Sequence, residues 1–355
     1  MFKKISAGFI IVVLSLSAGS RAVTAGMEFP QFYEMEEGNV VFHAKIEVPP
    51  QFKPELLKQS TADCVTADGE KAFKYFAGNR ETVEYHEDST TGEFYRTLAD
   101  GSSFSYIPPG YISYTSENMQ YYSAAYRYYD NRELFAQEKE FSFATQDDCM
   151  KKLRKLIQDI GYGNVQLTGS FYCLDYETLL AEEKHEDPES GQINKSRNKV
   201  SWTPEDNAYQ FYASQQFQDL PVYHSILGIP DDDENGCLIS GIYSSRGFEN
   251  VSIMDIFEFH ETNDKIELLP FEQCAEKVSE KYNRILTESV FTINRATLYQ
   301  YIRRDRGTGK DQEVSPIWYF DVLEEGPDTE NPEDKILRNR TVLINAVNGE
   351  EIVTE

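Results

Sequence analysis

Positive charge and long hydrophobic runs are scarce in this sequence. Its 355 residues include 34 Lys and Arg against 60 Asp and Glu, which gives a formal charge of −26. Such a protein would be repelled by a nucleic-acid backbone or an anionic lipid surface. We therefore expect no nucleic-acid partner. The chain is nevertheless 40% hydrophobic, which provides enough apolar material for folded cores.

The longest apolar run lies in the first 25 residues. Lys3 and Lys4 precede an apolar core at residues 8–14, and the segment closes with small residues up to Ala25. This pattern is typical of a secretory signal peptide, cleaved after Ala25. A permanent anchor is the weaker alternative, because the run is interrupted by serines and stops at Arg21, short of the roughly 20 residues that span a bilayer. The sequence predicts a secreted or cell-surface protein with no stable membrane span after cleavage.

Motifs for common catalytic chemistries are also missing. The sequence has no Gly-x-Ser-x-Gly of an α/β-hydrolase and no histidine pair spaced as in helical zinc proteases. Its five cysteines show no C-x-x-C spacing, so they indicate neither a zinc site nor a thioredoxin-like redox pair. We expect the cysteines to be buried as small hydrophobic residues. Cys149 and Cys173 are the one pair that could come into contact, if their helix and strand pack together. These absences favour a non-enzymatic protein without excluding an enzyme.

Two amphipathic helices are readable from capping signals and spacing. Thr145 can cap the first, with Asp148 three residues later, and Gly161 ends it. The second begins at Pro270, a favoured first-turn residue. Each helix carries one apolar stripe at spacings of three and four. The stripes are Cys149, Leu153, Leu156, Ile157 and Ile160 in the first helix, and Phe271, Cys274, Ala275, Val278 and Tyr282 in the second.

Runs rich in β-branched and aromatic residues follow each helix. They are residues 165–176 and 208–222 after the first, and 290–302, 317–323 and 341–347 after the second. The helix–strand–strand order thus occurs twice. The sequence predicts an α+β fold: a duplicated module of antiparallel sheet with one helix packed across a face, plus a β-rich N-terminal region. The expected divisions are a signal peptide (1–25), the N-terminal region (26–140), and two modules (141–225 and 226–355).

Short motifs in the second module resemble the end of PepSY-type modules. A Trp-bearing strand, Pro316-Ile317-Trp318-Tyr319-Phe320, precedes a final strand that ends in Asn345-Ala346 and a turn at Gly349. In the first module, the Phe-Gln-Asp-Leu-Pro-Val of residues 217–222 resembles the strand entry of extracytoplasmic regulators of the YycH and YycI type. The resemblance implies exported proteins that bind or restrain a partner such as a protease or a sensor kinase. Those regulators usually keep an N-terminal membrane helix, whereas cleavage after Ala25 would release this chain.

One acidic segment partly matches a calcium loop. Asp231, Asp233 and Asn235 place oxygens at positions 1, 3 and 5, and Gly236 occupies the turn position 6. The bidentate Glu expected at position 12 is replaced by Ile242, so the ligand set would be incomplete. The segment predicts either a plain acidic turn or a weak calcium site; no other cofactor is expected.

Tyrosine is concentrated between residues 106 and 129, where eight occur. The segment from Gly110 to Arg127 has the composition of a strand. Exposed rings there could stack on sugars or grip a peptide, and Tyr121, Tyr126 and Tyr128 are the candidates for ligand or partner contact. The plainer interpretation is that tyrosine is simply a favoured strand residue.

Two functions from different classes are compatible with these patterns. The first is an exported non-enzymatic binding or regulatory protein that engages a protein partner at the cell envelope. The alternative is a surface protein that binds or processes carbohydrate, using exposed tyrosines and paired carboxylates. The signal peptide, the repeated module and the missing catalytic motifs favour the first.

Overall fold

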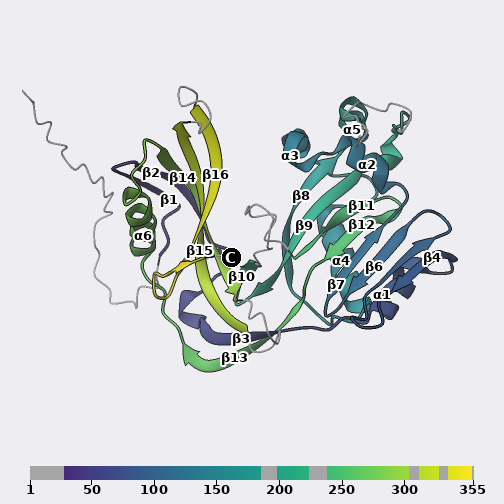
Figure 1. Ribbon diagram of the computed structural model, residues 1–355, viewed down its shortest axis with the longest axis horizontal. Helices are drawn as coiled ribbons and strands as arrows, with labels where there is room; N and C mark the ends of the chain where they lie inside the picture. Colours follow the sequence, from purple (N-terminus) through teal and green to yellow (C-terminus); the bar gives the residue numbers. More distant parts are fainter. Residues whose placement is uncertain (1–27, 185–197, 224–237, 304–311, 328–334, 354–355) are drawn as a thin grey trace, which may run out of the picture.

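The computed structural model describes residues 28–184, 198–223, 238–303, 312–327 and 335–353. These residues form two sheets, called sheet A and sheet B below, each with helix packed on a face (Figure 1). The fold is α+β, as the sequence predicts. The expected signal peptide, residues 1–25, lies outside the described residues. Among the helices that are described, none is both long and apolar enough to cross a membrane.

Sheet B is antiparallel throughout. The order of its strands is β4-β5-β6-β7-β12-β11-β9-β8. Their bounds are β4 Thr82–Glu87, β5 Phe94–Leu98, β6 Ser103–Ile107, β7 Tyr111–Thr115, β8 Leu167–Leu174, β9 Ala208–Phe217, β11 Ile239–Ser244 and β12 Gly247–Ile253. Side chains alternate between its two faces along every strand. On β6, for example, Phe104 and Tyr106 are buried while Ser103 and Ser105 are only partly buried.

Helices α1 (Gly69–Ala77) and α4 (Gln146–Asp159) pack on the apolar face of sheet B. Thr145 and Asp148 form the predicted capping box of α4, which satisfies backbone N–H groups at the first turn. The expected stripe of α4 is fully buried in one core with inward-facing strand residues such as Ile112, Phe211 and Val251. The first predicted helix is therefore confirmed in position, cap and buried side.

A group of short helices, called the cap below, covers one end of the opposite face of sheet B, at the top of Figure 1. It consists of α2 (Met119–Ala125), α3 (Tyr128–Asn131), η2 (Arg132–Phe135), α5 (Tyr176–Glu182) and η4 (Pro204–Asp206). Tyr122, Phe135, Leu179 and Trp202 pack there against Ile242 of β11. The expected strand over 110–127 is correct only for β7, since burial of Tyr122 in the cap stabilises helix in the following segment.

Sheet A is mixed, with the order β1-β2-β14-β15-β16-β17. The pairing of β2 with β14 is parallel and the others are antiparallel. Farther along, β14 pairs with β10, and the start of β15 pairs with β3, which also pairs with β13. The bounds are β1 Phe32–Glu37, β2 Val40–Glu47, β3 Lys58–Cys64, β10 Leu220–Tyr223, β13 Phe257–Lys265, β14 Val290–Ile302, β15 Gln312–Pro327, β16 Lys335–Asn345 and β17 Glu351–Ile352, with a short η1 at Pro54–Leu56.

Helix α6 (Phe271–Asn283) begins after Pro270 and lies on the face of sheet A turned away from sheet B (Figure 1). Its predicted apolar stripe is buried against β2, β14, β15 and β16. Trp318 and Ala346 belong to this core. Trp318 lies directly opposite Ile344, so Ala346, the residue that follows β16, is its diagonal neighbour. Packing of a large residue near a small one thus accounts for both.

The two sheets are joined by the β9–β10 hairpin, because β9 belongs to sheet B and β10 pairs with β14 of sheet A. Gln218 and Asp219 form its turn with φ of 49° and 63°, as a type I′ turn requires. The Gln218 amide also donates to the Lys58 carbonyl at 3.3 Å and the Ser60 hydroxyl at 3.2 Å on β3. These hydrogen bonds hold the turn of the β9–β10 hairpin, which joins the two sheets, against β3.

The region 26–140 is rich in strands, and it supplies both sheets. Strands β1 to β3 join sheet A, whereas β4 to β7 form half of sheet B. The helix–strand–strand order occurs in both halves as α4-β8-β9 and α6-β14-β15, although α5 lies between β8 and β9. Each sheet is thus assembled from distant parts of the chain.

Candidate functional site

The face of sheet B opposite α1 and α4 carries a row of polar side chains across all eight strands, and seven of the eight side chains have a hydroxyl group. The register places the following residues opposite one another from β4 to β8: His86, Tyr95, Ser105, Ser113, Ser252, Ser240, Tyr212 and Ser170. We call this set the hydroxyl row. Side chains that are directly opposite in neighbouring strands lie on the same face. The four consecutive serines Ser105, Ser113, Ser252 and Ser240 therefore form a continuous central strip with a tyrosine on either side.

A second row runs parallel to it on the same face. It contains Glu84, Thr97, Ser103, Thr115, Asn250, Ile242, Gln210 and Tyr172. Ile242 packs against the buried residues of the cap, so the cap begins to cover this face at Ile242. The two rows together contain one carboxylate, Glu84, and one imidazole, His86. We call the part of this face beyond the cap the open face.

The open face is accessible to solvent. Ser105, Ser113, Ser240 and Ser252 are partly exposed although they lie on inner strands of the sheet. Within the described residues their hydroxyl groups make no side-chain hydrogen bond. A serine hydroxyl can donate one hydrogen bond and accept two. The strip therefore presents a line of groups able to donate to, and accept from, a ligand.

Tyrosines border the serine strip on both sides. Tyr95 on β5 is 39% exposed, and its hydroxyl accepts a hydrogen bond from Thr97 at 3.3 Å. On the other side, the Tyr212 and Tyr172 rings pack edge to face with centroids 6.1 Å apart. Such pairs hold each ring in a defined orientation. The open face thus combines small hydroxyls in its middle with oriented aromatic rings at its margins.

A buried ionic network attaches the cap to sheet B beside the open face. Arg246, in the β11–β12 turn, donates to Glu249 at 2.7 Å, to Asp206 at 2.9 Å and to the Tyr122 hydroxyl at 3.0 Å. Lys199 also pairs with Asp206. The carboxylates are almost fully buried, with Glu249 2% and Asp206 3% exposed. Because two cations face two carboxylates, the network is balanced in charge.

Burial and pairing shift the pKa values in this network. Burial opposes ionisation of Asp206, but its hydrogen bonds to Lys199, Thr203 and Arg246 outweigh this and lower its pKa. Burial raises the pKa of Tyr122 far above its usual value. Glu249 also accepts hydrogen bonds from Ser244 at 2.7 Å and from Ser116 at 2.5 Å. These contacts join α2 and η4 of the cap to the β11–β12 turn of sheet B, so the network holds the cap on the sheet.

The tyrosines expected to contact a ligand lie in or next to the cap. Tyr126 is 8% exposed and packs against Phe135 with ring centroids 5.4 Å apart, so it belongs to the core instead of an exposed contact surface. Tyr121 is partly buried at the edge of the same core. Tyr128 is the first residue of α3, and its side chain is outside the described part of the structure. Tyr121 and Tyr126 therefore pack in the cap and lie outside the open face.

The incomplete calcium loop, with Asp231, Asp233 and Asn235, lies outside the described residues. Among the residues that are described, no three His, Cys, Asp or Glu side chains converge as a metal site would require. Cys64, Cys149, Cys173 and Cys274 are free thiols, and all but Cys64 are buried. Cys149 and Cys173 share one core without a disulfide.

The hydroxyl row cannot be predicted from the sequence, because it depends on the register in which the strands of sheet B pair. The serines of its central strip come from β6, β7, β11 and β12, and the pairing of β7 with β12 brings together distant segments. A local signal exists in the alternation of small polar and large apolar residues, as in Ser103-Phe104-Ser105-Tyr106. That signal identifies the more solvent-exposed side of one strand. It does not show that the exposed residues of different strands lie opposite one another.

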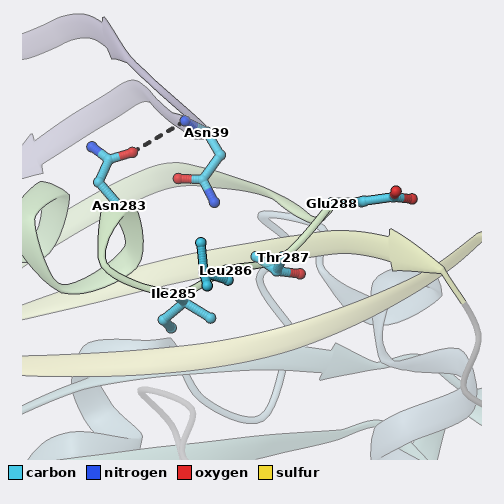
Figure 2. Close-up of a pocket in the computed structure, with 6 residues that line it drawn as sticks. All are labelled: Asn39, Asn283, Ile285, Leu286, Thr287 and Glu288. Carbon is cyan, nitrogen blue, oxygen red and sulfur yellow. Dashed lines mark hydrogen bonds between the residues drawn. The ribbon is translucent and has the colours of Figure 1, made fainter.

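A shallow hollow of about 560 Å³ lies where α6 ends, beside the turn between β1 and β2 (Figure 2). The backbone N–H of Asn39 donates to the Asn283 side-chain oxygen at 3.2 Å at its margin. Ile285, Leu286 and Thr287 supply much of the remaining lining. Glu288 points away from the other labelled side chains in Figure 2. The hollow therefore gathers no set of convergent charged groups.

Comparison with known proteins shows the fold and nothing about activity. No family model matches the chain, and no curated protein matches it. Among solved structures, the chain is similar to the crystal structure of an uncharacterized protein from Eubacterium rectale ATCC 33656. The TM-score is 0.66 at 13% identity, over 92% of this chain and 94% of the other. The likeness thus extends over both sheets.

Proposed function

We propose that this protein is a non-enzymatic recognition protein, exported to the cell envelope, and that it binds its ligand through the open face of sheet B. The observation that carries the proposal is the hydroxyl row: unpaired serine hydroxyls on inner strands, bordered by tyrosines. Export is supported by the signal-peptide pattern of residues 1–25.

Tyrosine, serine and asparagine are the residues that antibody binding loops use most. Tyrosine supplies rigid contact area at low entropic cost, and serine and asparagine supply adaptable hydrogen bonds. The open face has this composition on a rigid sheet, which lowers the entropic cost of ordering it on binding. A protein partner, as the sequence and the family resemblance suggest, and a glycan are the two ligand classes that such a surface can serve.

The test is co-sedimentation of the purified mature protein with cell envelopes from the producing bacterium. Ser113→Arg places a long charged side chain in the middle of the strip, so we expect it to abolish most of the co-sedimentation. Asn263→Arg, at an exposed position of β13 in sheet A, adds the same charge away from the open face and serves as the matched control.

Ser252→Arg, at the position opposite Ser113, repeats the test from another strand. Thermal melting of each variant shows whether it is folded, and only folded variants are compared. Equal co-sedimentation of the wild-type protein and both folded open-face variants would contradict the proposal. A loss in the Asn263→Arg variant as large as that in Ser113→Arg would contradict it as well.

A further inference from the structure

We infer that the ligand of the open face is an uncharged glycan chain that lies across the strands along the hydroxyl row. This inference rests on the proposed function and adds to it the chemical class of the ligand. Three features carry it: the near absence of charge, the hydrogen-bonding capacity of the strip, and the placement of the aromatic rings.

The open face is nearly free of charge on a strongly acidic protein. The whole chain carries −26, yet the two rows hold only Glu84 as a carboxylate and His86 as an ionisable imidazole. An anionic polymer would be repelled by the protein as a whole, and a cationic one would be drawn to the acidic surfaces elsewhere. A neutral ligand matches the local surface, because its binding leaves no charge desolvated and unpaired.

The serine strip and a glycan present the same hydrogen-bonding group, the hydroxyl. Every sugar hydroxyl is both a donor and an acceptor, as is every serine hydroxyl, so each partner can adopt the role that the other leaves open. Outside antibody binding loops, serine is depleted in protein–protein interfaces and rare among their hot spots. A strip made of Ser105, Ser113, Ser252 and Ser240 therefore favours a glycan over a protein partner.

Aromatic rings lie at both ends of the serine strip, where they could contact the two ends of a short glycan segment. Tyr95 and Tyr212 are five strand spacings apart, about 24 Å at roughly 4.8 Å per spacing. The faces of aromatic rings carry partial negative charge and attract the C–H groups that line one side of a pyranose ring. The Tyr172–Tyr212 pair and the partly exposed Tyr95 thus provide a contact for sugar rings at each margin.

The experiment is affinity electrophoresis and isothermal titration calorimetry of the mature protein with a panel of soluble neutral polysaccharides, and with an anionic polysaccharide for comparison. We expect the wild-type protein to bind at least one neutral polysaccharide and not the anionic one. Tyr212→Ala and Tyr95→Ala each remove one aromatic contact and should weaken binding by about tenfold. Tyr75→Ala removes an exposed tyrosine of α1, on the opposite side of sheet B, and should leave the affinity unchanged.

The outcomes separate this inference from the proposed function. If no neutral polysaccharide binds while Ser113→Arg still abolishes co-sedimentation with envelopes, the glycan is wrong and the open face binds another ligand class. A polysaccharide bound equally well by the wild-type protein, by Tyr212→Ala and by Ser113→Arg would overturn the assignment of glycan to this face. If envelopes also bind all three proteins equally, the proposed function fails with it.

Discussion

Sheets A and B each bury one face beneath an amphipathic helix, and they differ in what lies on the other face. In sheet A that face holds a second packed cluster, in which Tyr223, Tyr301 and Tyr319 are buried with Ile317 and Leu343. In sheet B the corresponding face carries hydroxyls that are partly exposed. Tyrosine is present on both faces but has different neighbours: other tyrosines in sheet A, and serines in sheet B.

The difference shows that one sheet packs both of its faces and the other leaves part of one face exposed, and we propose that this exposed part serves recognition. A sheet needs only one buried face to be stable, and antiparallel sheets commonly leave the other in water. Within the described residues, sheet A uses both faces for packing, whereas sheet B packs one face and has the cap over one end of the other. The open face is therefore the surface on which substitutions should affect binding more than folding.

The largest expected effect is on stability, at the second face of sheet A. Tyr319 is 2% exposed and its ring lies 5.3 Å from that of Tyr223. Tyr319→Ala should lower the free energy of unfolding by about 3–5 kcal/mol, because it leaves a cavity in a packed cluster. Tyr95→Ala, on the open face, should lower it by less than about 1 kcal/mol. Urea unfolding of both variants measures the contrast, and equal losses would refute it.

The ionic network should give the next largest effect. Glu249→Gln keeps the shape of the side chain but removes the carboxylate that faces Arg246. We expect the free energy of unfolding to fall by about 2 kcal/mol, because the partly exposed Arg246 then loses the charge of one of its two carboxylates. Calorimetric melting would check this, and a melting temperature unchanged from wild type would show that the cap does not depend on the network.

Acid should weaken the same attachment. The folded-state pKa of Asp206 is lowered, so its stabilising contribution is complete above the unfolded value of about 3.9 and is lost as the pH falls through the folded-state pKa. Urea unfolding between pH 6 and about pH 2 should show stability falling with acid. Asp206→Asn should be less stable at neutral pH but fall less steeply. Parallel curves for the two proteins would contradict this assignment.

The smallest effect concerns the two helices. Thr145 caps α4 through its side chain, whereas α6 starts at Pro270 without a side-chain cap. Thr145→Ala should therefore cost about 1 kcal/mol, and Pro270→Ala distinctly less. Paired urea titrations would measure this; a larger loss for Pro270→Ala would reverse the expected order.

Local chemistry made part of this fold predictable. The capping box of Thr145 and Asp148, the start of α6 directly after Pro270 and the buried stripes of both helices all follow from residues close together in the sequence. The same is true of the strands that follow each helix. These features can be predicted from the capping residues at each helix end and from the spacing of apolar residues along the chain.

The candidate site was not predictable in this way. The tyrosine-rich segment favours a strand, but tertiary packing of Tyr122 and Ala125 makes residues 119–125 a helix of the cap. The hydroxyl row requires that β12, far along the chain, pair with β7 in a register that aligns Ser252 with Ser113. A shift of one residue would place the buried Val251 or Ile253 there instead. Pairings of this kind are fixed by the assembled core and not by any local segment.

Hydroxyl-radical footprinting of the purified protein, with and without cell envelopes, tests the central claim most directly. It reports the solvent accessibility of individual tyrosines in the intact chain. Tyr95 and Tyr212 lie on the open face, whereas Tyr75 and Tyr85 are exposed on the other side of sheet B. The account predicts that envelopes protect the first pair and leave the second pair unchanged. Protection of Tyr75 and Tyr85 with no change at Tyr95 and Tyr212 would contradict it.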